Sequence, residues 1–571
     1  MSIFKLKQSN EIVILDFVGA NVAKKLHAGH MRNLNIGETL RRILSLKYPH
    51  LLSDNHWGDW GVNMGILLWG WKVEGKIENY QKNPINELTR IYVWANSQKE
   101  NTEKWQNWDK LVRNEFLKLE QKDPENYNLW QEFILKTKIY LQNDLQIMNV
   151  PPLNLDQGES FYEQNVKNLW DFLEKYKIWQ TEDKARFFDF EEICKNLPLD
   201  KQNLELKKTF ASFGRCYLVS SSGYTSYAFR DIAARIQWIT DLDATKMITI
   251  TANEQIHHFQ QVFGICHYLS TLSKFQEEFG QKISRELIWQ NLIHISYGFL
   301  TLQTGKMSSR KGNVLTIKDL FDEVQTEAKV ILSEKSQVTD PDQLEQKSAK
   351  VTLAALKWYD LNRGSADNLV LNIKEILNFV GNTGVYQLYT LARLKSILKK
   401  NSQKNSTNLE SKIDYKTQNN LEKNLENLEI KNKKIEVKDD FTIQFEKENQ
   451  QLSKVITNFD NFDLLSKTPF NTDFNYNFDF NSLNLEEKVI LKKIYLTDLI
   501  LEKICTTFKP HLLCNHLFEL CTLVNSWYSK HSVSGETDNL RKQTLLKLVD
   551  KIIIYLQNSL ELLGVQTLEE L

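Results

Sequence analysis

Cysteine spacing of the kind that binds zinc is missing from this sequence. The cysteines include no Cys-x-x-Cys pair, and none stands at a His/Cys spacing suited to zinc; they are Cys194, Cys216, Cys266, Cys505, Cys514 and Cys521. Cysteines without such spacing are typical of free, buried thiols in a reducing compartment. We therefore expect no tightly bound metal held by the protein.

Long apolar runs and a net charge are also missing. Nowhere do about 18 apolar residues follow one another, which is the length that a membrane-spanning helix needs. We therefore expect a soluble, cytoplasmic protein with no membrane partner. Lysine plus arginine and aspartate plus glutamate number 72 each. This balance neither supports nor excludes a nucleic-acid partner, because binding needs a basic face and not a basic average.

The stretch from Glu11 to Pro49 reads as a strand, a turn and a helix. The apolar run Ile12–Val18 suits a buried strand, and Gly19-Ala20-Asn21 follows as a turn. Then His27-Ala28-Gly29-His30 opens a pattern of helically spaced apolar residues that ends before Pro49. Backbone N–H groups and the dipole at a helix start favour negative charge. We expect a phosphate there, with Gly29 allowing close approach and both imidazoles donating hydrogen bonds.

A second polar segment stands far downstream. Residues 305–313 read Gly-Lys-Met-Ser-Ser-Arg-Lys-Gly-Asn and combine three cations with two hydroxyl groups and two glycines. Alone, this segment would be read as a solvated basic turn, as most short charge runs are. His-x-Gly-His alone would be read as a helix start with two surface histidines. Both segments in one chain, in this order, disfavour those readings.

Together the two segments resemble the paired signatures of class I aminoacyl-tRNA synthetases. In that family the downstream segment supplies cations for the β- and γ-phosphates of ATP. Further motifs, spread over most of the chain, make the resemblance specific to arginyl-tRNA synthetases. They are Asp16-Phe17-x-x-x-Asn21, Gly58-Asp59-Trp60-Gly61, Tyr227-x-x-Arg230-Asp231, Glu254-Gln255-x-x-His258-Phe259-x-Gln261, Ala355-Leu356-Lys357-Trp358, Gly381-Asn382-Thr383-Gly384, Leu391-Ala392-Arg393 and Leu562-Leu563-Gly564-Val565.

The resemblance implies one cleft for arginine and ATP. The implied arginine-binding residues are Asp16, Asn21, His27, Tyr227, Asp231 and Gln255. The implied ATP-binding residues are His27, Gly29, His30, Lys306, Met307, Ser308, Ser309 and Arg310, and the implied catalytic residues are His27, His30, Lys306 and Lys24. Lys24 is included because Ser309 replaces the usual second lysine of the downstream segment, and family members with this change often carry a lysine before the upstream histidine. Asp16 stands where the family commonly has the longer Glu.

The implied reaction is arginine–tRNA ligation. ATP, with the Mg²⁺ that it carries, converts L-arginine to arginyl-adenylate, and the arginyl group then passes to the 2′-hydroxyl of the terminal adenosine of tRNA(Arg). The chain is expected to act as a monomer. Two alternatives stay open, a non-catalytic synthetase-like protein that binds tRNA and a class I synthetase for cysteine or glutamine. The absence of zinc-ligand spacing disfavours the cysteine enzyme. The two aspartates expected in the pocket disfavour the cysteine enzyme and the glutamine enzyme alike.

The expected fold is an α/β Rossmann-like catalytic domain with a parallel sheet over residues 1–320, followed by an all-α anticodon-binding domain over residues 321–571. A helical insertion with tryptophans as packing anchors is expected at about residues 65–152, and an Asn- and Lys-rich insertion at about residues 401–484. Because the first strand begins soon after Met1, the resemblance also implies that the N-terminal domain that grips the tRNA elbow in typical members is absent.

The sequence also predicts several strands, one tight loop and a set of candidate base-stacking residues. Arg186–Phe190, Tyr217–Val219 and Lys246–Thr251 are predicted as strands. The turn-rich segment 54–61 is predicted as a tight loop with Gly58 and Gly61 at positive φ. In the C-terminal half, aromatic side chains are candidates for stacking on unpaired anticodon bases, with packing inside the domain an equally good alternative. They are Tyr386, Tyr389 and Tyr528.

Overall fold

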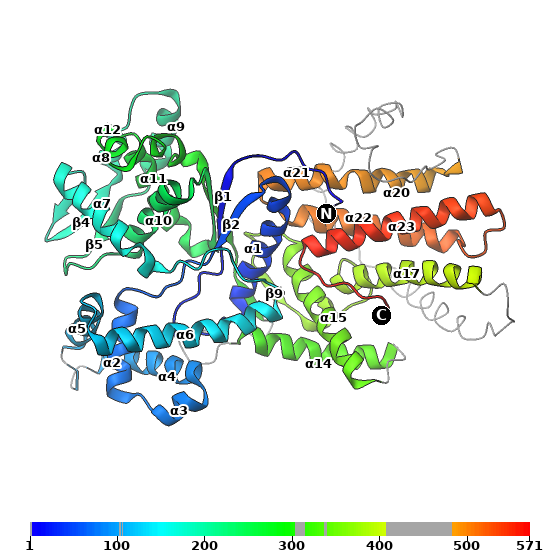
Figure 1. Ribbon diagram of the computed structural model, residues 1–571, viewed down its shortest axis with the longest axis horizontal. Helices are drawn as coiled ribbons and strands as arrows, with labels where there is room; N and C mark the ends of the chain where they lie inside the picture. The colour runs from blue at the N-terminus through cyan, green and yellow to red at the C-terminus, as the bar shows by residue number, and fades with distance from the viewer. Residues whose placement is uncertain are drawn as a thin grey trace. The chain divides into compact units, whose positions relative to one another are not determined.

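The computed structural model describes residues 3–101, 104–105, 107–302, 315–335, 340–406 and 482–570 (Figure 1). The chain divides into two compact units. The first comprises Met1–Lys395, Leu485–His531 and Lys551–Leu571, and the second comprises Ser396–Asn484 and Ser532–Asp550. The first unit contains the parallel sheet and all the described site residues discussed below.

The central sheet has four parallel strands in the order β2-β1-β6-β7. They are β1 (Ile12–Asp16), β2 (His50–Asp54), β6 (Lys246–Ala252) and β7 (Leu292–Tyr297). β1 and β6 were predicted from their apolar runs, whereas β2 and β7 were not. Val13, Ile14 and Leu15 have no exposed surface, as expected for a parallel sheet covered on both faces.

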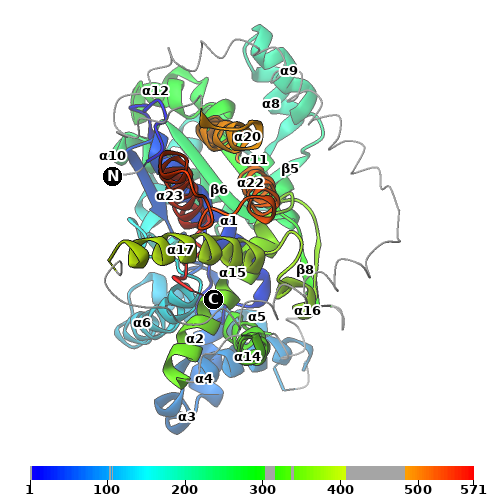
Figure 2. The same cartoon turned by 90° about the vertical axis from the view of Figure 1, so that its right-hand side faces the viewer.

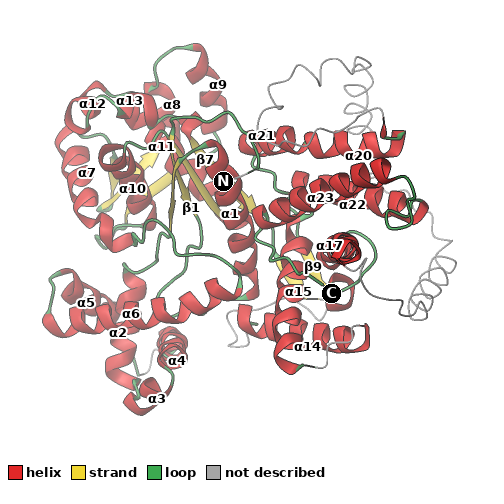
Figure 3. Ribbon diagram, turned by 45° about the vertical axis from the view of Figure 1, so that its right-hand side comes forward, coloured by secondary structure: helices red, strands yellow, loops and turns green. Residues whose placement is uncertain are grey.

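Helices cover both faces of this sheet (Figure 3). The helix that follows β1, α1 (Ala28–Lys47), contacts β1, β2 and β6. On the other face, Ile14 belongs to a large apolar cluster with residues of α10 (Tyr227–Leu242) and α11 (Ile256–Ser270). The parallel strands with helices on both faces confirm the predicted Rossmann-like fold.

The group of helices that follows β2 in the sequence carries the tryptophan anchors. It consists of α2 (Val62–Glu74), α3 (Ile77–Lys82), α4 (Pro84–Ser97), α5 (Trp108–Glu120) and α6 (Pro124–Ile147). The Trp69 ring lies 5.6 Å from Trp94, 5.0 Å from Trp105 and 6.4 Å from Trp108, measured between ring centroids. The tryptophans therefore pack against one another, as predicted.

Shorter elements connect the strands of the sheet. A second, antiparallel sheet consists of β3 (Gln180–Glu182), β4 (Ala185–Asp189) and β5 (Arg215–Val219); its last two strands were predicted. β8 (Leu300–Leu302) pairs with β9 (Leu369–Leu371). The accompanying helices are η2 (Glu159–Tyr162), α7 (Glu163–Tyr176), α8 (Phe190–Asn196), α9 (Lys201–Phe210), η3 (Asn253–Gln255), α12 (Ser273–Phe279) and α13 (Ile283–Glu286).

The described C-terminal part is helical apart from β9, as predicted (Figure 2). Its helices are α14 (Ile317–Lys335), α15 (Pro341–Leu361), α16 (Ile373–Ile376), α17 (Gly384–Ser406), α20 (Leu485–Tyr495), α21 (Thr497–Thr507), α22 (His511–Lys530) and α23 (Asn539–Leu562). Most of the predicted Asn- and Lys-rich insertion, residues 407–481, lies outside the described residues.

Two further features can be compared with the sequence, namely the state of the cysteines and the apolar character of the helices. All six cysteines are free; Cys194 is partly exposed and the other five are buried, so the prediction of free thiols is confirmed. Within the described ranges, no helix has the length and apolar character that a membrane span requires.

Candidate active site

A cleft of about 760 Å³ opens at the carboxyl ends of the parallel strands, where open α/β sheets bind ligands. The structure brings together there every predicted arginine- or ATP-binding residue that it describes. Those lining residues are Asp16, Asn21, His27, Gly29, His30, Tyr227, Asp231 and Gln255. The predicted Lys306, Met307, Ser308, Ser309 and Arg310 lie outside the described residues.

One end of the cleft is formed by His27 and His30, which we call the histidine cap. The Gly29 N–H donates to His27 Nδ1 over 3.1 Å, and the His27 N–H donates to His30 Nδ1 over 3.1 Å. The two rings lie 3.9 Å apart between centroids. The two side chains thus satisfy backbone N–H groups that the first turn of α1 would otherwise leave unpaired.

The histidine cap is uncharged at neutral pH. Burial, followed by the charge of Lys24, lowers the pKa of His27. Burial, followed by His27, lowers the pKa of His30 to about 3. Because Nδ1 of each ring accepts a hydrogen bond, the proton of each neutral imidazole belongs on Nε2. Each ring therefore keeps one N–H donor for a ligand, and the positive end of α1 lies beside them.

The segment around the cap pairs with the segment that follows the downstream signature. The Ala28 N–H donates to the Leu315 carbonyl over 2.9 Å, and the Ile317 N–H donates to the Leu26 carbonyl over 3.1 Å. His27 and Thr316 form an antiparallel bridge between them. The two predicted signatures are therefore joined at their borders, although they are far apart in the sequence.

Lys24 does not line the cleft. Its Nζ lies 4.8 Å from the centre of the Tyr92 ring on α4, at a distance typical of a cation–π contact. Contact with an α-phosphate would require this side chain to leave Tyr92.

A second group of charged residues at the cleft, which we call the acidic floor, consists of Asp16, Asp231, Asp54 and Arg235. Asp16 and Asp231 line the cleft. Asp54 and Arg235 are not among the lining residues, but Asp54 is paired with Asp16 in the sheet and Arg235 contacts Asp231. The parallel register pairs Asp16 on β1 with Asp54 on β2. Paired residues on adjacent parallel strands lie on one face of the sheet, about 5 Å apart. Two ionised carboxylates at that distance repel each other by roughly 3 kcal/mol at an effective dielectric constant of about 20. Both residues are buried, with exposed fractions of 5% and 0%.

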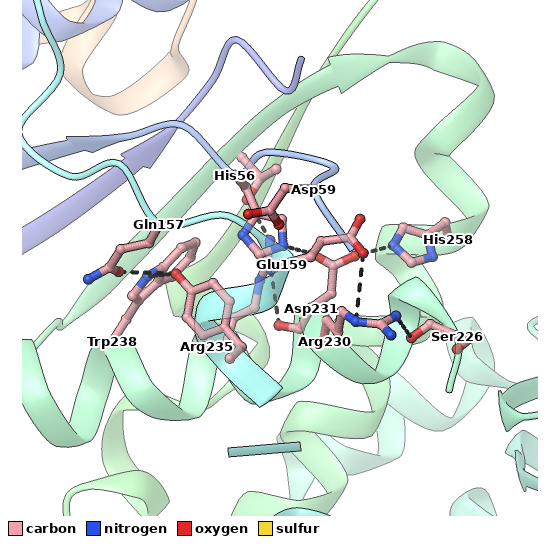
Figure 4. A network of polar contacts seen from close by, with 12 residues as sticks. His56, Asp59, Gln157, Glu159, Ser226, Arg230, Asp231, Arg235, Trp238 and His258 are labelled. Carbon is pink, nitrogen blue, oxygen red and sulfur yellow. Dashed lines mark hydrogen bonds and ion pairs between the residues drawn. The ribbon is translucent and has the colours of Figure 1, made fainter. Parts of the chain in front are cut away.

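Asp231 is the best-paired acid of the floor (Figure 4). Its Oδ1 accepts from Arg235 Nη1 over 2.7 Å, and its Oδ2 lies 2.7 Å from His258 Nε2. Burial would raise the pKa of Asp231, but the Arg235 charge and the His258 contact outweigh it and hold that pKa well below its usual value. Asp231 is therefore ionised at neutral pH.

Asp16 and Asp54 have the opposite tendency. Burial, followed by repulsion from Asp54, raises the pKa of Asp16 to about 8. Burial raises the pKa of Asp54 to about 7. Arg235 lowers both values but does not overcome burial. The floor therefore holds more acidic groups than its single guanidinium neutralises.

Asn21 depends on a glycine in the predicted loop. Asn21 and Gly58 form a parallel bridge, and a Cβ at Gly58 would lie 2.2 Å from Asn21 Oδ1. Gly61 has φ +88°, as predicted, but Gly58 is not among the residues with positive φ, so that prediction was wrong. Gly58 leaves room for the Asn21 side chain; it does not serve a left-handed turn.

Several residues of the cleft were not assigned a role from the sequence. His56, Glu159 and Arg230 line it, and Arg235 lies beneath Asp231. Arg230 Nε donates to Glu163 over 3.0 Å and lies 3.7 Å from Glu159 (Figure 4). Burial raises the pKa of Glu159 to about 8. The spacing of Asp231 and Arg235, four residues apart on a predicted helix, was a usable signal for an ion pair.

The candidate anticodon tyrosines are half-buried. Tyr386 Oη accepts from Asn525 Nδ2 over 2.9 Å, and the Tyr389 ring lies 6.2 Å from Phe379. The Arg393 guanidinium lies 4.4 Å from the centre of the Tyr528 ring. Each tyrosine thus has a packing or hydrogen-bonding partner and remains partly exposed.

Two family models match this sequence. One, tRNA synthetases class I (R), catalytic domain, covers residues 3–373, and the other, DALR anticodon binding domain, covers residues 463–571. The first match and the cleft described above define a class I aminoacyl-tRNA synthetase, an enzyme class for which ATP is a substrate.

Curated relatives and solved structures agree with that class. Arginine–tRNA ligases from Fusobacterium nucleatum and Clostridium perfringens are 28% and 27% identical, each over 98% of this chain and 80% of the relative. The arginyl-tRNA synthetase structures from Thermus thermophilus and Plasmodium falciparum superpose with TM-scores of 0.69 and 0.66 at 16% and 19% identity. They match 100% of this chain and 84% and 78% of theirs; at these identities the likeness shows the fold alone.

The chain belongs to the class I tRNA synthetase family designated R, the family for arginine. Its function is the ATP-dependent ligation of arginine to tRNA.

Proposed function

We propose that the acidic floor binds the guanidinium of L-arginine. A guanidinium is planar and permanently charged, and carboxylates in its plane satisfy it best. Asp16 and Asp231 both line the cleft, and each oxygen of Asp231 already accepts one hydrogen bond, which leaves a lone pair on each for the substrate. At roughly 1.5 to 3 kcal/mol for each charged hydrogen bond, two carboxylates would select arginine over a neutral isostere by about a hundredfold or more.

The remaining arginine contacts follow from the positions of four cleft residues. Asn21 would hold the α-carboxylate or the α-amino group, and His27 would lie beside it. Tyr227 is 58% exposed and its ring lies 4.4 Å from His258, so it would cover the aliphatic stem. Gln255 ends η3, beyond β6, and would bind the amine.

The histidine cap and the start of α1 would bind the phosphates of ATP. The two Nε2–H groups and the open backbone at Gly29 would donate to phosphate oxygens. Lys306, Met307, Ser308, Ser309 and Arg310 would complete the site as in the family, and Lys24 would reach the α-phosphate after leaving Tyr92. Mg²⁺ would arrive with ATP as part of that substrate.

The reaction requires no nucleophile from the protein. The arginine carboxylate oxygen attacks the α-phosphorus, the bond to the β-phosphate oxygen breaks, and pyrophosphate leaves. The terminal ribose 2′-hydroxyl of tRNA(Arg) then attacks the arginyl carbonyl, AMP leaves, and the hydroxyl proton goes to solvent or phosphate. Position and charge stabilisation supply the rate acceleration.

We also propose domain bounds, anticodon contacts and an oligomeric state for this chain. Residues 1–320 would be the catalytic domain with an insertion at about 65–152, and residues 321–571 the anticodon-binding domain with an insertion at about 401–484. Tyr386, Tyr389 and Tyr528 would stack on anticodon bases with their exposed ring surfaces. We propose that the chain works as a monomer in the cytoplasm.

The convergence of Asp16, Asp231 and the histidine cap on one cleft carries this proposal. The test is pyrophosphate exchange with each of a panel of amino acids, measured with and without tRNA. Of the amino acids in the panel, only arginine should support exchange. Exchange with cysteine or glutamine would contradict the proposed pocket, and full aminoacylation after changing both His27 and Lys306 to Ala would contradict the roles of the phosphate ligands.

A further inference from the structure

The acidic floor contains an excess of acid that its own cation does not balance. Among the described residues, Asp16, Asp54 and Asp231 share one guanidinium, Arg235, which has no exposed surface. The other titratable groups that act on the Asp16–Asp54 pair are Tyr162 on η2, which faces both acids, and Asp156, which faces Asp54. His56, after β2, contacts Asp16 through its backbone. His56 is buried and burial lowers its pKa to about 4, so it adds no positive charge at neutral pH.

The pairing of these groups shows which acid lacks a partner. Arg235 gives Nη1 to Asp231 and Nη2 to Thr249 Oγ1, the latter over 2.9 Å. Asp54 Oδ1 accepts from the backbone N–H groups of Asn55 and Gln157. Asp54 Oδ2 is buried and has no hydrogen-bond partner among the described residues. Such an unpaired buried oxygen is far more costly on a carboxylate than on a neutral acid.

We propose that the empty acidic floor holds one proton, shared by Asp16 and Asp54, and that a bound guanidinium expels it. The inference rests on the proposed function of the cleft. The step is balanced as follows: the O–H bond of one carboxylic acid breaks, the proton goes to water, and the remaining carboxylate pairs with the guanidinium. The guanidinium keeps its own proton throughout because it does not deprotonate in proteins.

Three observations support this step. The β1–β2 register holds the two acids side by side in a buried place, where like charges cannot both ionise without a nearby cation. Arg235, the only guanidinium of the acidic floor, pairs with Asp231. Asp16 and Asp54 therefore have no hydrogen-bonded cation within the acidic floor. The pKa of Asp16 is raised to about 8 and that of Asp54 to about 7, and the two acids titrate as one coupled group.

A proton store of this kind makes selectivity depend on pH. Above the pKa of the pair, the floor is charged and arginine binds without loss of a proton. Below it, each arginine must displace a proton, so its apparent affinity falls by up to about tenfold per pH unit. A neutral isostere such as citrulline cannot displace the proton, so its affinity stays nearly constant and the discrimination between the two narrows as pH falls.

Calorimetric titration of the full-length chain with L-arginine tests the inference. At pH 7.0 the titration is done in two buffers with different ionisation enthalpies, and the difference in observed heat gives the protons exchanged. We expect release of roughly 0.5 to 1 proton per arginine at pH 7, and close to none at pH 9.5. Arginine that binds at pH 7 without proton release would overturn this inference alone. Failure of arginine to bind in any buffer would overturn the proposed function, and this inference with it.

Two matched variants locate the proton. Asp54→Asn should at least halve the release, because it removes one acid and keeps the Oδ1 acceptor. Asp144→Asn is the control: Asp144 on α6 is also buried with its pKa raised to about 7, but unlike Asp54 it is neither paired with Asp16 in the sheet nor among the charges that act on it, so release should not change. Undiminished release in Asp54→Asn would assign the proton to another group and overturn the inference.

A second measurement removes the dependence on the folding of the variant. The dissociation constant of arginine for the unmodified chain, measured from pH 6 to 9, should rise as pH falls below about 8, with a slope of up to about tenfold per unit. A constant value over this range would overturn the inference.

Discussion

The two ends of the cleft respond to burial in opposite ways. At the histidine cap, burial removes charge from bases, so the pKa of His30 falls to about 3 and both rings act as neutral donors. At the acidic floor, burial removes charge from acids, so the pKa of Asp16 rises to about 8. The comparison teaches that one physical effect gives the two ends opposite chemistry, with neutral N–H donors at one and protonated acids at the other.

The dependence of stability on pH also has opposite signs at the two ends. The floor acids keep protons that the unfolded chain releases above pH 3.8, so their contribution to stability is lost as pH rises toward 8. The cap histidines stay unprotonated at pH values below 6.5, where the same residues in the unfolded chain become protonated. Their contribution to the stability of the folded state is therefore lost as pH falls toward 3. Each end can therefore be perturbed separately.

The largest effect is expected at the floor. Asp231→Asn leaves Arg235 without its carboxylate, a change of roughly 2 to 5 kcal/mol for a buried charge pair. We expect kcat/KM for arginine to fall by up to about a thousandfold, with little change in KM for ATP. Steady-state pyrophosphate exchange measures both constants. Glu87→Gln, which breaks a partly buried 2.6 Å contact with Arg90 on α4, is the control and should leave both constants unchanged. Equal losses for arginine and ATP would break the distinction between the two ends.

A smaller effect is expected at the histidine cap. His30→Ala removes one Nε2–H donor, which is worth roughly a hundredfold in kcat for a donor to developing charge. KM for arginine should not change. The control is His267→Ala, a buried histidine on α11 that contacts Asn203 over 2.9 Å; it should lower the melting temperature and leave kcat near its original value. A raised arginine KM in His30→Ala would place this residue in the arginine pocket.

The neutral state of the histidine cap predicts a loss of stability at acidic pH. With a folded pKa of about 3 and an ordinary value of 6.5, His30 should cost the folded state about 2 kcal/mol between pH 7 and pH 5. The melting temperature of the His30→Gln variant should therefore fall less over this range than that of the unmodified chain. Thermal denaturation at the two pH values measures the difference, and parallel falls would contradict the buried, neutral state of His30.

The smallest effect is expected between the two ends, at Gly58. The Cβ of Gly58→Ala would lie 2.2 Å from Asn21 Oδ1, so the Asn21 side chain must move. We expect about a tenfold rise in KM for arginine and little change in melting temperature. Gly37→Ala, whose Cβ would lie 2.2 Å from the buried Phe17 ring, is the contrasting variant and should lower stability instead. An unchanged arginine KM in Gly58→Ala would remove Asn21 from the substrate contacts.

Much of the site could be predicted because its parts follow local features. Asp16 ends an apolar run, His27 begins a helical pattern, and Gln255 follows the β6 run, so each was placed at the edge of the sheet from its own neighbours. The prediction of one cleft needed only the rule that parallel strands share a carboxyl edge.

The rest depends on relations between distant segments. Asp54 enters the floor through the register of β2 against β1, and β2 itself was missed because its apolar part, Leu51-Leu52, is too short to show a period. Gly58 was assigned to a left-handed turn because glycine commonly serves that purpose, whereas a close approach by Asn21 is invisible in local sequence. The orientation of Lys24 toward Tyr92 likewise depends on how α4 packs.

The backbone pairing of Leu26–Ala28 with Leu315–Ile317 has a consequence for synthesis of the chain. The first histidine leaves the ribosome early, but its partner residues follow only after β6 and β7 have been translated. A nascent chain therefore carries an open, incomplete cleft for most of its elongation, and closure of this long loop is a late folding step. If the proposed nucleotide site is correct, truncated products that end before residue 315 lack one side of it and should not compete with the full-length chain for ATP.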